Sequence, residues 1–554
     1  MDDTDGVTGL ASGAGPGPDA TAAAAARAGS TTTRALARAG LIVTVLFLAS
    51  RVLGYVRTIA IAAAVPDVGD LGPFFAAFRI PDFLFQLVAA GALSSTLIPI
   101  IAGLFATDQE ARAWRVVSTI TTLMLSALVL LAGVVLLFAP GLVGVITPGF
   151  DEAELAQTTE LTRIMVLSPM FLAAGAMATS ILNARGRFAA SALAPLVYNL
   201  GIIAGALILV PAFGVPGLAY GVVLGAAGHL LVQVPAVAGL GARLRPRVDI
   251  RDEQARLALV LMIPRAIGLG ATQLVFLVMT SLASTLGPEA LAEFSFAFAI
   301  LQIPIGVIGV PLGIVLLPSL AREAATGATA GFAHLLGRGL AILAYVMIGI
   351  AALGIVVSQD IVRLLFGVAD IGEPAILATA DALAVFLLGL TAHSLIAVLA
   401  RAFYALQDTK TPVAAALLAV VANIVIANLL IGPLGLNGLA AAIAIAAWLE
   451  TVVLVVLLRA RTAALAPGLR HLGVVMVKTL LVAIVGGAVA FGVETVLTDR
   501  WGVDPGYVLL VVRSGTAVAA GGLVIVAGSL LLRIGELGTI TGVLLDVARR
   551  RSAA

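Results

Sequence analysis

The chain has 554 residues, of which 61% are hydrophobic and 11% are charged, and its mean hydropathy is +1.14. A soluble domain has roughly 45–50% apolar and about 25% charged residues. A water-soluble fold of this length would therefore lack the charges to cover its surface, which excludes a cytosolic enzyme and indicates an all-α polytopic membrane protein. The absence of cysteine excludes disulfides, thiolate nucleophiles and Cys-ligated metals.

The chain begins with a polar segment and continues as a series of apolar runs. Residues 1–38 are rich in Ala, Gly, Thr and Asp and lack the apolar core of a signal peptide, which predicts a disordered cytoplasmic tail. Apolar runs of about 20 residues then predict fourteen membrane spans. These spans cover approximately 41–65, 73–105, 116–146, 157–183, 190–212, 215–240, 255–285, 290–319, 332–358, 374–404, 412–432, 436–458, 473–497 and 506–532.

The distribution of basic residues predicts the orientation of these spans. Cytoplasmic loops retain Lys and Arg. With fourteen spans, 23 of the 32 basic residues fall in the segments on one side, seven lie in or at the ends of spans, and the opposite loops contain Arg363 and Arg500 alone. Both termini are therefore predicted to be cytoplasmic, and the acidic segment 151–154 is predicted to face outward.

Short motifs that recur in order indicate an internal duplication. The recurrences lie 214 to 223 positions apart, in corresponding spans. They are RVLG at 51–54 with RAIG at 265–268, Ile80-Pro81 with Ile303-Pro304, LIP at 97–99 with LLP at 316–318, and GLA at 217–219 with GLA at 438–440. They predict two pseudo-symmetric six-helix lobes related by an axis along the membrane normal, followed by two additional helices.

The predicted domains follow from this duplication. They are an N-lobe over 39–240 (helices 1–6), a C-lobe over 241–471 (helices 7–12), additional helices 13–14 over 472–534 and a cytoplasmic C-terminal tail over 535–554. Two similar lobes that meet at a central cavity suit alternating access. They give an enzyme no obvious advantage, and the chain has no Walker loop that would make ATP the direct energy source.

Several arginines lie within the predicted spans. An ionisable group at the centre of a span costs at least about 2.5–3.5 kcal/mol unless it faces a polar cavity or a partner. The candidates for a cationic, anion-binding cavity between the lobes are Arg51, Arg57, Arg79 and Arg265. Arginine suits phosphate because its planar fork donates two parallel hydrogen bonds. The alternative is that Arg57 and Arg79 extend to the interface or pair with Asp70 or Asp82.

Other ionisable residues are candidates for ion coupling or gating. These are Asp82, Glu450, Asp408 and Lys410. Asp82 could equally form a structural ion pair with Arg79, and Asp408 and Lys410 could cap helices at a cytoplasmic turn. Lys478 and Arg513, in the two additional helices, are expected to extend toward the membrane surface. We expect no cofactor and no bound metal, apart from a coupling ion of unknown identity.

Specific motifs resemble those of the MurJ/MviN family of lipid II flippases, within the multidrug/oligosaccharidyl-lipid/polysaccharide exporter superfamily. The resemblance runs in order through spans 1–12. It is carried by SRVLGYVR at 50–57, FFAAFRIP at 74–81, GALS at 91–94, TPGF at 147–150, LLPSL at 316–320 and QDTKTPV at 407–413.

The resemblance implies a transporter that moves undecaprenyl-pyrophosphate-linked peptidoglycan precursor from the inner to the outer leaflet of the bacterial plasma membrane. Its implied partners are lipid II or a similar polyprenyl-pyrophosphate saccharide, membrane lipids and, as a candidate, the cell-wall synthesis machinery. No nucleic acid is implied. In this family, arginines like Arg51 and Arg57 line the central cavity, a basic residue occupies the place of Arg79, and helices 13 and 14 form a groove for the lipid tail.

The chain departs from the family pattern at charged positions of spans 2 and 8. Phe85, Gln86 and Ala90 stand where many members carry an Arg pair and a Glu, and Phe298-Ala299 stands where many carry Asp-Arg. Arg265 is the candidate to compensate. The alternative functions are export of another polyprenyl-linked oligosaccharide and small-molecule antiport.

Overall fold

The computed structural model describes residues 45–46, 48–65, 67–90, 97–369 and 371–552, with the side chains of 89–90, 264–265, 267–269, 271–272, 368, 543–544 and 546–552 outside the description. Every regular element in these residues is helical, which confirms the predicted all-α class. Eleven helices of the described part are long and apolar enough to cross a membrane, and a bent pair, α16–α17, makes a twelfth. The predicted spans 41–65 and 255–285 include residues outside the description, so the count is consistent with fourteen.

The first lobe is built from spans that are broken into shorter helices. The first helix covers residues 48–64, and the turn at Asp67 starts the next one because its carboxylate accepts a hydrogen bond from the Gly69 N–H at 2.9 Å. The remaining elements are α2 (Val68–Phe85), the π-helix η1 (Gln86–Ala90), α3 (Ile98–Ala106), α4 (Glu110–Ile146), α5 (Glu152–Met165), α6 (Ser168–Ala184), α7 (Phe188–Ala204), η3 (Gly205–Leu209), α8 (Val210–Phe213), α9 (Pro216–Leu231) and α10 (Val234–Ala238).

The second lobe and the C-terminal helices continue the same pattern. The second lobe contains α11 (Glu253–Ser284), α12 (Pro288–Pro304), the π-helix η4 (Ile305–Gly309), α13 (Val310–Ala325), α14 (Thr329–Val356), α15 (Ser358–Phe366), η5 (Gly367–Ala369), α16 (Glu373–Leu387), α17 (Leu390–Ala405), α18 (Lys410–Leu434) and α19 (Leu436–Arg461). The C-terminal part contains η6 (Ala463–Leu465), α20 (Ala466–Trp501), α21 (Tyr507–Leu531) and α22 (Gly535–Ser552).

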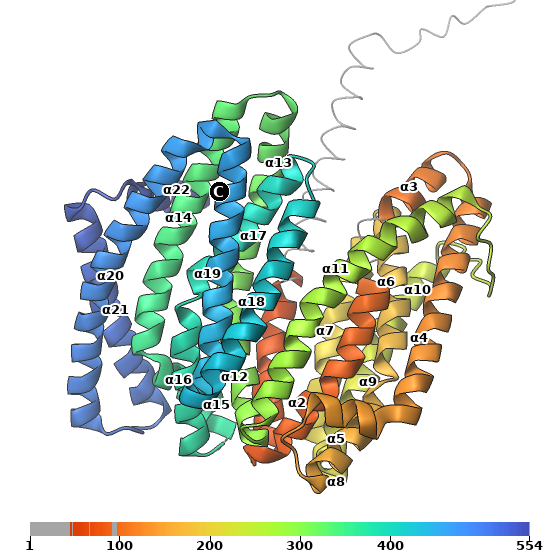
Figure 1. Ribbon diagram of the computed structural model, residues 1–554, viewed down its shortest axis with the longest axis horizontal. Helices are drawn as coiled ribbons and strands as arrows, with labels where there is room; N and C mark the ends of the chain where they lie inside the picture. Colours follow the sequence, from red (N-terminus) through yellow and green to blue (C-terminus); the bar gives the residue numbers. More distant parts are fainter. Residues whose placement is uncertain (1–44, 47, 66, 91–96, 370, 553–554) are drawn as a thin grey trace, which may run out of the picture.

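The helices form two groups with α11 running obliquely between them (Figure 1). The first half of α11 packs into the first lobe, where Ala255, Ala258 and Met262 join the buried core around α3, α4 and α6. Its second half joins the other core, in which Met279 and Ala283 are fully buried. The helix therefore connects the two lobes mechanically, and α20 and α21 lie on the outer flank of the second lobe (Figure 1).

The repeated motifs occupy equivalent structural positions. A Cβ placed on Gly217 would lie 2.5 Å from the backbone carbonyl carbon of Leu209, and one placed on Gly438 would lie 2.3 Å from the backbone oxygen of Leu430. Each glycine thus lets the first turn of one helix touch the end of the preceding one, 221 positions apart in the two lobes. The π-helices η1 and η4 also correspond, since η4 begins 219 positions after Gln86. These contacts confirm the predicted pseudo-symmetry, while the domain boundaries stay predictions.

The two lobes touch closely at the end that is predicted to be external. Here α2 packs against α12, and the rings of Phe75 and Phe296 meet edge to face at 5.6 Å. A Cβ on Gly72 would lie 2.4 Å from the carbonyl oxygen of Pro288, and one on Gly149 would lie 2.1 Å from that of Ser284. Because both neighbours are backbone atoms, only glycine permits this approach of the lobes.

The C-terminal hairpin is attached to the second lobe by a buried ion pair. Arg513 on α21 and Asp360 on α15 are 1% and 0% exposed. The Arg513 Nε donates to Asp360 Oδ2 at 3.1 Å, Nη2 donates to Oδ1, and Nη1 donates to the carbonyl oxygens of Gly502 and Val503 at 2.8 and 3.2 Å. The prediction that Arg513 extends toward the membrane surface was therefore wrong, because its partner lies on the neighbouring helix α15. Lys478 donates from Nζ to the carbonyl oxygen of Leu532 at 2.9 Å.

We predict that Arg513→Met destabilises the protein by about 3–5 kcal/mol, because it leaves the Asp360 carboxylate buried without a counter-charge. Thermal unfolding of the purified protein in detergent measures the effect. Arg513→Met combined with Asp360→Asn should recover part of the loss, and the exposed Arg500→Met should change nothing. A wild-type unfolding temperature for Arg513→Met alone would show that the pair does not attach the hairpin.

Candidate functional site

Asn199 on α7 connects the first helix to the first lobe. Its side chain is 7% exposed, and its Nδ2 donates to the carbonyl oxygens of Ser50 at 3.4 Å and Pro195 at 3.1 Å. Its Oδ1 accepts a hydrogen bond from Arg57 Nη1 at 3.3 Å. The amide therefore fixes both the backbone of the first helix and the guanidinium of Arg57, which is half-buried.

Arg51 reaches toward the second lobe. A Cβ placed on Gly306, in the π-helix η4, would lie 2.7 Å from Arg51 Nη1, so the guanidinium occupies the space that a larger residue would fill. The same side chain lines a cavity of about 280 Å³ together with Thr179, Asn183 and Ser191. Arg51 thus lies between a cavity of the first lobe and a glycine of the second.

Two polar contacts join α2 to α11. Arg79 Nε donates to Thr280 Oγ1 at 3.1 Å, and the guanidinium carbon lies 5.5 Å from the centre of the Phe276 ring. One turn further along α2, Asp82 Oδ2 accepts a hydrogen bond from Gln273 Nε2 at 2.8 Å. Among the described residues no ion pair joins Arg79 to Asp82, so the structure favours contacts between lobes over the alternative pair within α2.

A second cavity, of about 520 Å³, lies beside the first. Arg57 and Asp82 line it, together with Tyr198 and His229. The two cavities share the lining residues Thr179, Ser191 and Pro195. The first lobe therefore contains adjoining cavities within the membrane spans, and Arg51, Arg57 and Asp82 contribute charged groups to their lining.

The charged residues that line the two cavities all belong to the first lobe. The second lobe contributes uncharged groups, namely Gln273, Thr280 and Gly306. Arg265 lies in the helical backbone of α11, but its side chain is outside the described residues. The structure thus brings together Arg51, Arg57 and Asp82 around the cavities, with Arg79 nearby on α2.

Asp408 lies in the turn before α18, away from the cavities. Its Oδ1 accepts hydrogen bonds from the backbone N–H groups of Lys410 at 2.9 Å and Thr411 at 3.0 Å, and its carboxylate also contacts the Arg461 guanidinium. The Thr411 hydroxyl, these backbone N–H groups and Arg461 lower the pKa of Asp408 to about 2. A carboxylate that stays ionised at neutral pH and binds a helix N-terminus has the properties of a cap. Lys410 is the first residue of that helix.

Glu450 lies elsewhere, on α19. It is half-buried and makes no hydrogen bond or ion pair within the described part of the chain. It does not line either cavity near the arginines. No group of three or more His, Asp or Glu side chains suited to a metal ion occurs in the described residues.

Sequence reasoning missed the uncharged partners of the arginines. Asn199 was not among the predicted site residues, although its amide binds both the backbone of the first helix and Arg57. Gln273 and Thr280 are amide and hydroxyl side chains in an apolar span, which is a usable signal because such groups need partners in a membrane. Gly306 carries no signal of its own in a chain with 59 glycines.

The arrangement can bind an anion. The guanidinium groups that line these cavities offer several N–H donors. Within a membrane span the dielectric is low, so their hydrogen bonds to phosphate oxygens are strong. Cationic ligands would be repelled by the same side chains.

Known proteins resemble the chain over most of its length. The family model for the lipid II flippase MurJ matches residues 68–511. The chain is 33% identical over 470 residues to a probable lipid II flippase MurJ of Rhizobium tropici, covering 82% of this chain and 85% of that one. It is 32% identical over 440 residues to the Vibrio cholerae protein of the same description, covering 76% and 83%.

Solved structures show the same fold. A lipid II flippase MurJ in an inward closed conformation aligns with TM-score 0.72 at 18% identity, covering 89% of this chain and 99% of that one. An inward-facing MATE family transporter of the MOP superfamily aligns with TM-score 0.62 at 16% identity, covering 76% and 98%. Because the matched segment covers most of the chain, from α2 into α21, the chain belongs to the lipid II flippase MurJ family.

Proposed function

We propose that this protein carries lipid II, the undecaprenyl-pyrophosphate-linked peptidoglycan precursor, from the inner to the outer leaflet of the bacterial plasma membrane, with both termini in the cytoplasm. The observation that carries the proposal is the set of guanidinium groups of Arg51 and Arg57, which line cavities within the first lobe, with Arg79 on the adjoining helix α2. Family membership and the names of the relatives at about 30% identity support the choice of lipid.

The guanidiniums would bind the pyrophosphate while the polyprenyl tail stays in the lipid. Pyrophosphate offers oxygen acceptors that match the paired N–H groups of arginine. Both Arg51 and Arg79 contact the second lobe, because Arg51 lies against Gly306 and Arg79 donates to Thr280. Binding of the headgroup would replace or rearrange these contacts and so favour a different arrangement of the lobes.

Alternating access would then expose the headgroup to the outside. The contacts between α2 and α12 close the predicted external end, and their separation would open it. In a cell that is negative inside, moving a negatively charged headgroup outward is favoured by about 2.3 kcal/mol per charge per 100 mV. The membrane potential would therefore favour outward movement of the headgroup. Asp82, which lines the cavity with Arg57, would adjust the net charge that moves.

We expect Arg51→Ala to abolish growth of cells in which this protein is the sole flippase. The loss of charge-assisted hydrogen bonds, about 1.5–3 kcal/mol, should weaken lipid II binding by about 10–100-fold in native mass spectrometry. Arg51→Lys should be intermediate, since it keeps the charge but loses the paired donors.

The control for this experiment is Arg322→Ala, an exposed arginine of α13, with membrane protein levels measured for each variant. Normal growth and wild-type lipid II binding by Arg51→Ala would contradict the proposed site. Co-purification of a different polyprenyl-linked saccharide with the wild-type protein would support the alternative exporter function.

A second prediction concerns the closed external end. Gly72→Ala should prevent the closest approach of α2 and α12, because its methyl carbon would meet the Pro288 carbonyl oxygen at 2.4 Å. The chain has no cysteine, so a single Phe75→Cys reporter can be labelled from outside without background. We expect several-fold faster labelling in the Gly72→Ala background.

The matched control is Gly133→Ala on α4, where an added Cβ meets nothing within 4 Å. Equal labelling rates for Gly72→Ala, Gly133→Ala and the parent would show that this contact does not control access from outside.

A further inference from the structure

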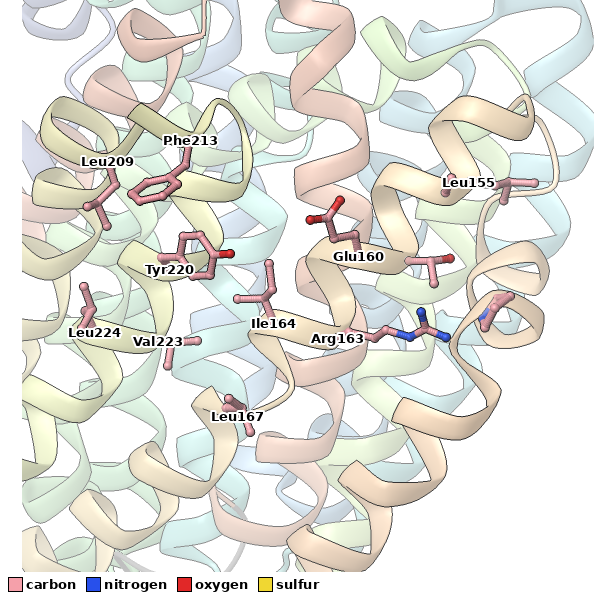
Figure 2. Close-up of a pocket in the computed structure, with 13 residues that line it drawn as sticks. Leu155, Glu160, Arg163, Ile164, Leu167, Leu209, Phe213, Tyr220, Val223 and Leu224 are labelled. Carbon is pink, nitrogen blue, oxygen red and sulfur yellow. The ribbon is translucent and has the colours of Figure 1, made fainter. Parts of the chain in front are cut away.

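A wide groove lies apart from the arginine cavities, on the flank of the first lobe. It has a volume of about 1,120 Å³ and lies between the end of α4, helix α5, the η3–α8 segment and α9 (Figure 2). Pro140, six residues before the end of α4, and Phe213, the last residue of α8, both line it. The groove therefore begins within two helical turns of the predicted external end of the bundle and extends inward as far as Leu224, eight residues into α9.

The walls of the groove are apolar and accessible from the membrane. Leu224 on α9 and Phe213 on α8 are 59% and 58% exposed, and Leu155, Ile164 and Leu209 continue the apolar lining. Large apolar side chains that are exposed on a membrane-spanning helix face lipid. A lipid acyl chain is therefore the chemistry that these walls accept.

Two charged side chains border this apolar space. Glu160 and Arg163 lie three residues apart on α5 and both line the groove. Figure 2 shows that their charged ends leave the helix in different directions. Both are exposed, and neither makes an ion pair or hydrogen bond through its side chain within the described part of the chain. One cation and one anion thus stand separately at the edge of an apolar pocket.

The position of α5 is well defined. Asp151 and Glu154 form a capping box, in which the Asp151 carboxylate accepts from the Glu154 N–H at 2.8 Å and the Glu154 carboxylate accepts from the Asp151 N–H at 2.9 Å. On the opposite wall, the rings of Phe213 and Tyr220 meet edge to face at 5.6 Å. Figure 2 shows the hydroxyl of Tyr220 directed from α9 toward α5. Aromatic residues with a polar tip are typical of the membrane interface, where phosphate groups meet acyl chains.

We propose that this groove is a binding site for a phospholipid of the surrounding outer leaflet whose headgroup contains a phosphate and a primary amine, the phosphatidylethanolamine class. The phosphate would accept hydrogen bonds from Arg163, the ammonium would donate to Glu160, and one acyl chain would lie along Phe213 and Leu224. A purely anionic headgroup would leave Glu160 unpaired beside a like charge. A choline headgroup has no N–H to donate.

The test uses the purified full-length protein and native mass spectrometry with three defined lipids: phosphatidylethanolamine, phosphatidylglycerol and phosphatidylcholine. We expect phosphatidylethanolamine to be retained preferentially. Arg163→Gln should weaken its binding by about tenfold or more, the scale of a lost charge-assisted hydrogen bond. Glu160→Gln should remove the preference for phosphatidylethanolamine over phosphatidylglycerol.

Matched variants separate the groove from general effects. Arg500→Gln removes an exposed arginine at the same end of the bundle, in α20, and should leave retention unchanged. Ala156→Trp should fill the groove and block binding, whereas Ala153→Trp, one turn earlier on α5 and outside the lining, should not.

Three results would overturn the proposal. They are equal retention of the three lipids by the wild-type protein, retention of phosphatidylglycerol alone, and retention of phosphatidylethanolamine that is unaffected by Arg163→Gln and Ala156→Trp. Wild-type binding of lipid II by the same variants would show that they are folded. The groove can therefore fail this test without affecting the proposed transport function.

Discussion

The structure depends on how guanidinium groups are accommodated inside a membrane. A charge in a span costs several kcal/mol unless a partner or a polar cavity receives it. Arg57 donates to the amide oxygen of Asn199, and Arg79 donates to the hydroxyl of Thr280. Arg51 lies between Gly306 and a cavity that Thr179 and Asn183 also line. The hydrogen-bond partners of Arg57 and Arg79 are neutral, and Asp82 is the acidic residue that lines a cavity with Arg57, so Arg51, Arg57 and Arg79 outnumber the carboxylate in this region.

A contrasting solution occurs in the C-terminal hairpin. Arg513 is fully buried against the carboxylate of Asp360 and two backbone carbonyls, so its hydrogen-bonding capacity is used within the protein. The comparison separates an arginine that holds helices together from arginines that border a cavity. It also explains how α21 is attached to α15 of the second lobe.

Sequence reasoning predicted the features that depend on composition and on local repetition. Apolar runs gave the spans, and the GLA motifs at 217–219 and 438–440 marked glycines that make the same helix contact in both lobes. Contacts between residues that are distant in sequence could not be predicted. Asp360 lies 153 positions from Arg513 and Thr280 lies 201 positions from Arg79, and neither pairing leaves a local pattern. Helix α22 also forms over residues that we expected to be a cytoplasmic tail.

The central claim is that the arginines of the first two helices recognise the pyrophosphate of a lipid-linked saccharide. The most direct measurement compares the affinity of the purified wild-type protein for lipid II, undecaprenyl pyrophosphate and undecaprenol, all at the same salt concentration. If the claim is correct, undecaprenyl pyrophosphate retains much of the affinity of lipid II, and undecaprenol, which lacks phosphate, binds at least about tenfold more weakly. Equal affinity for undecaprenol and undecaprenyl pyrophosphate would contradict it.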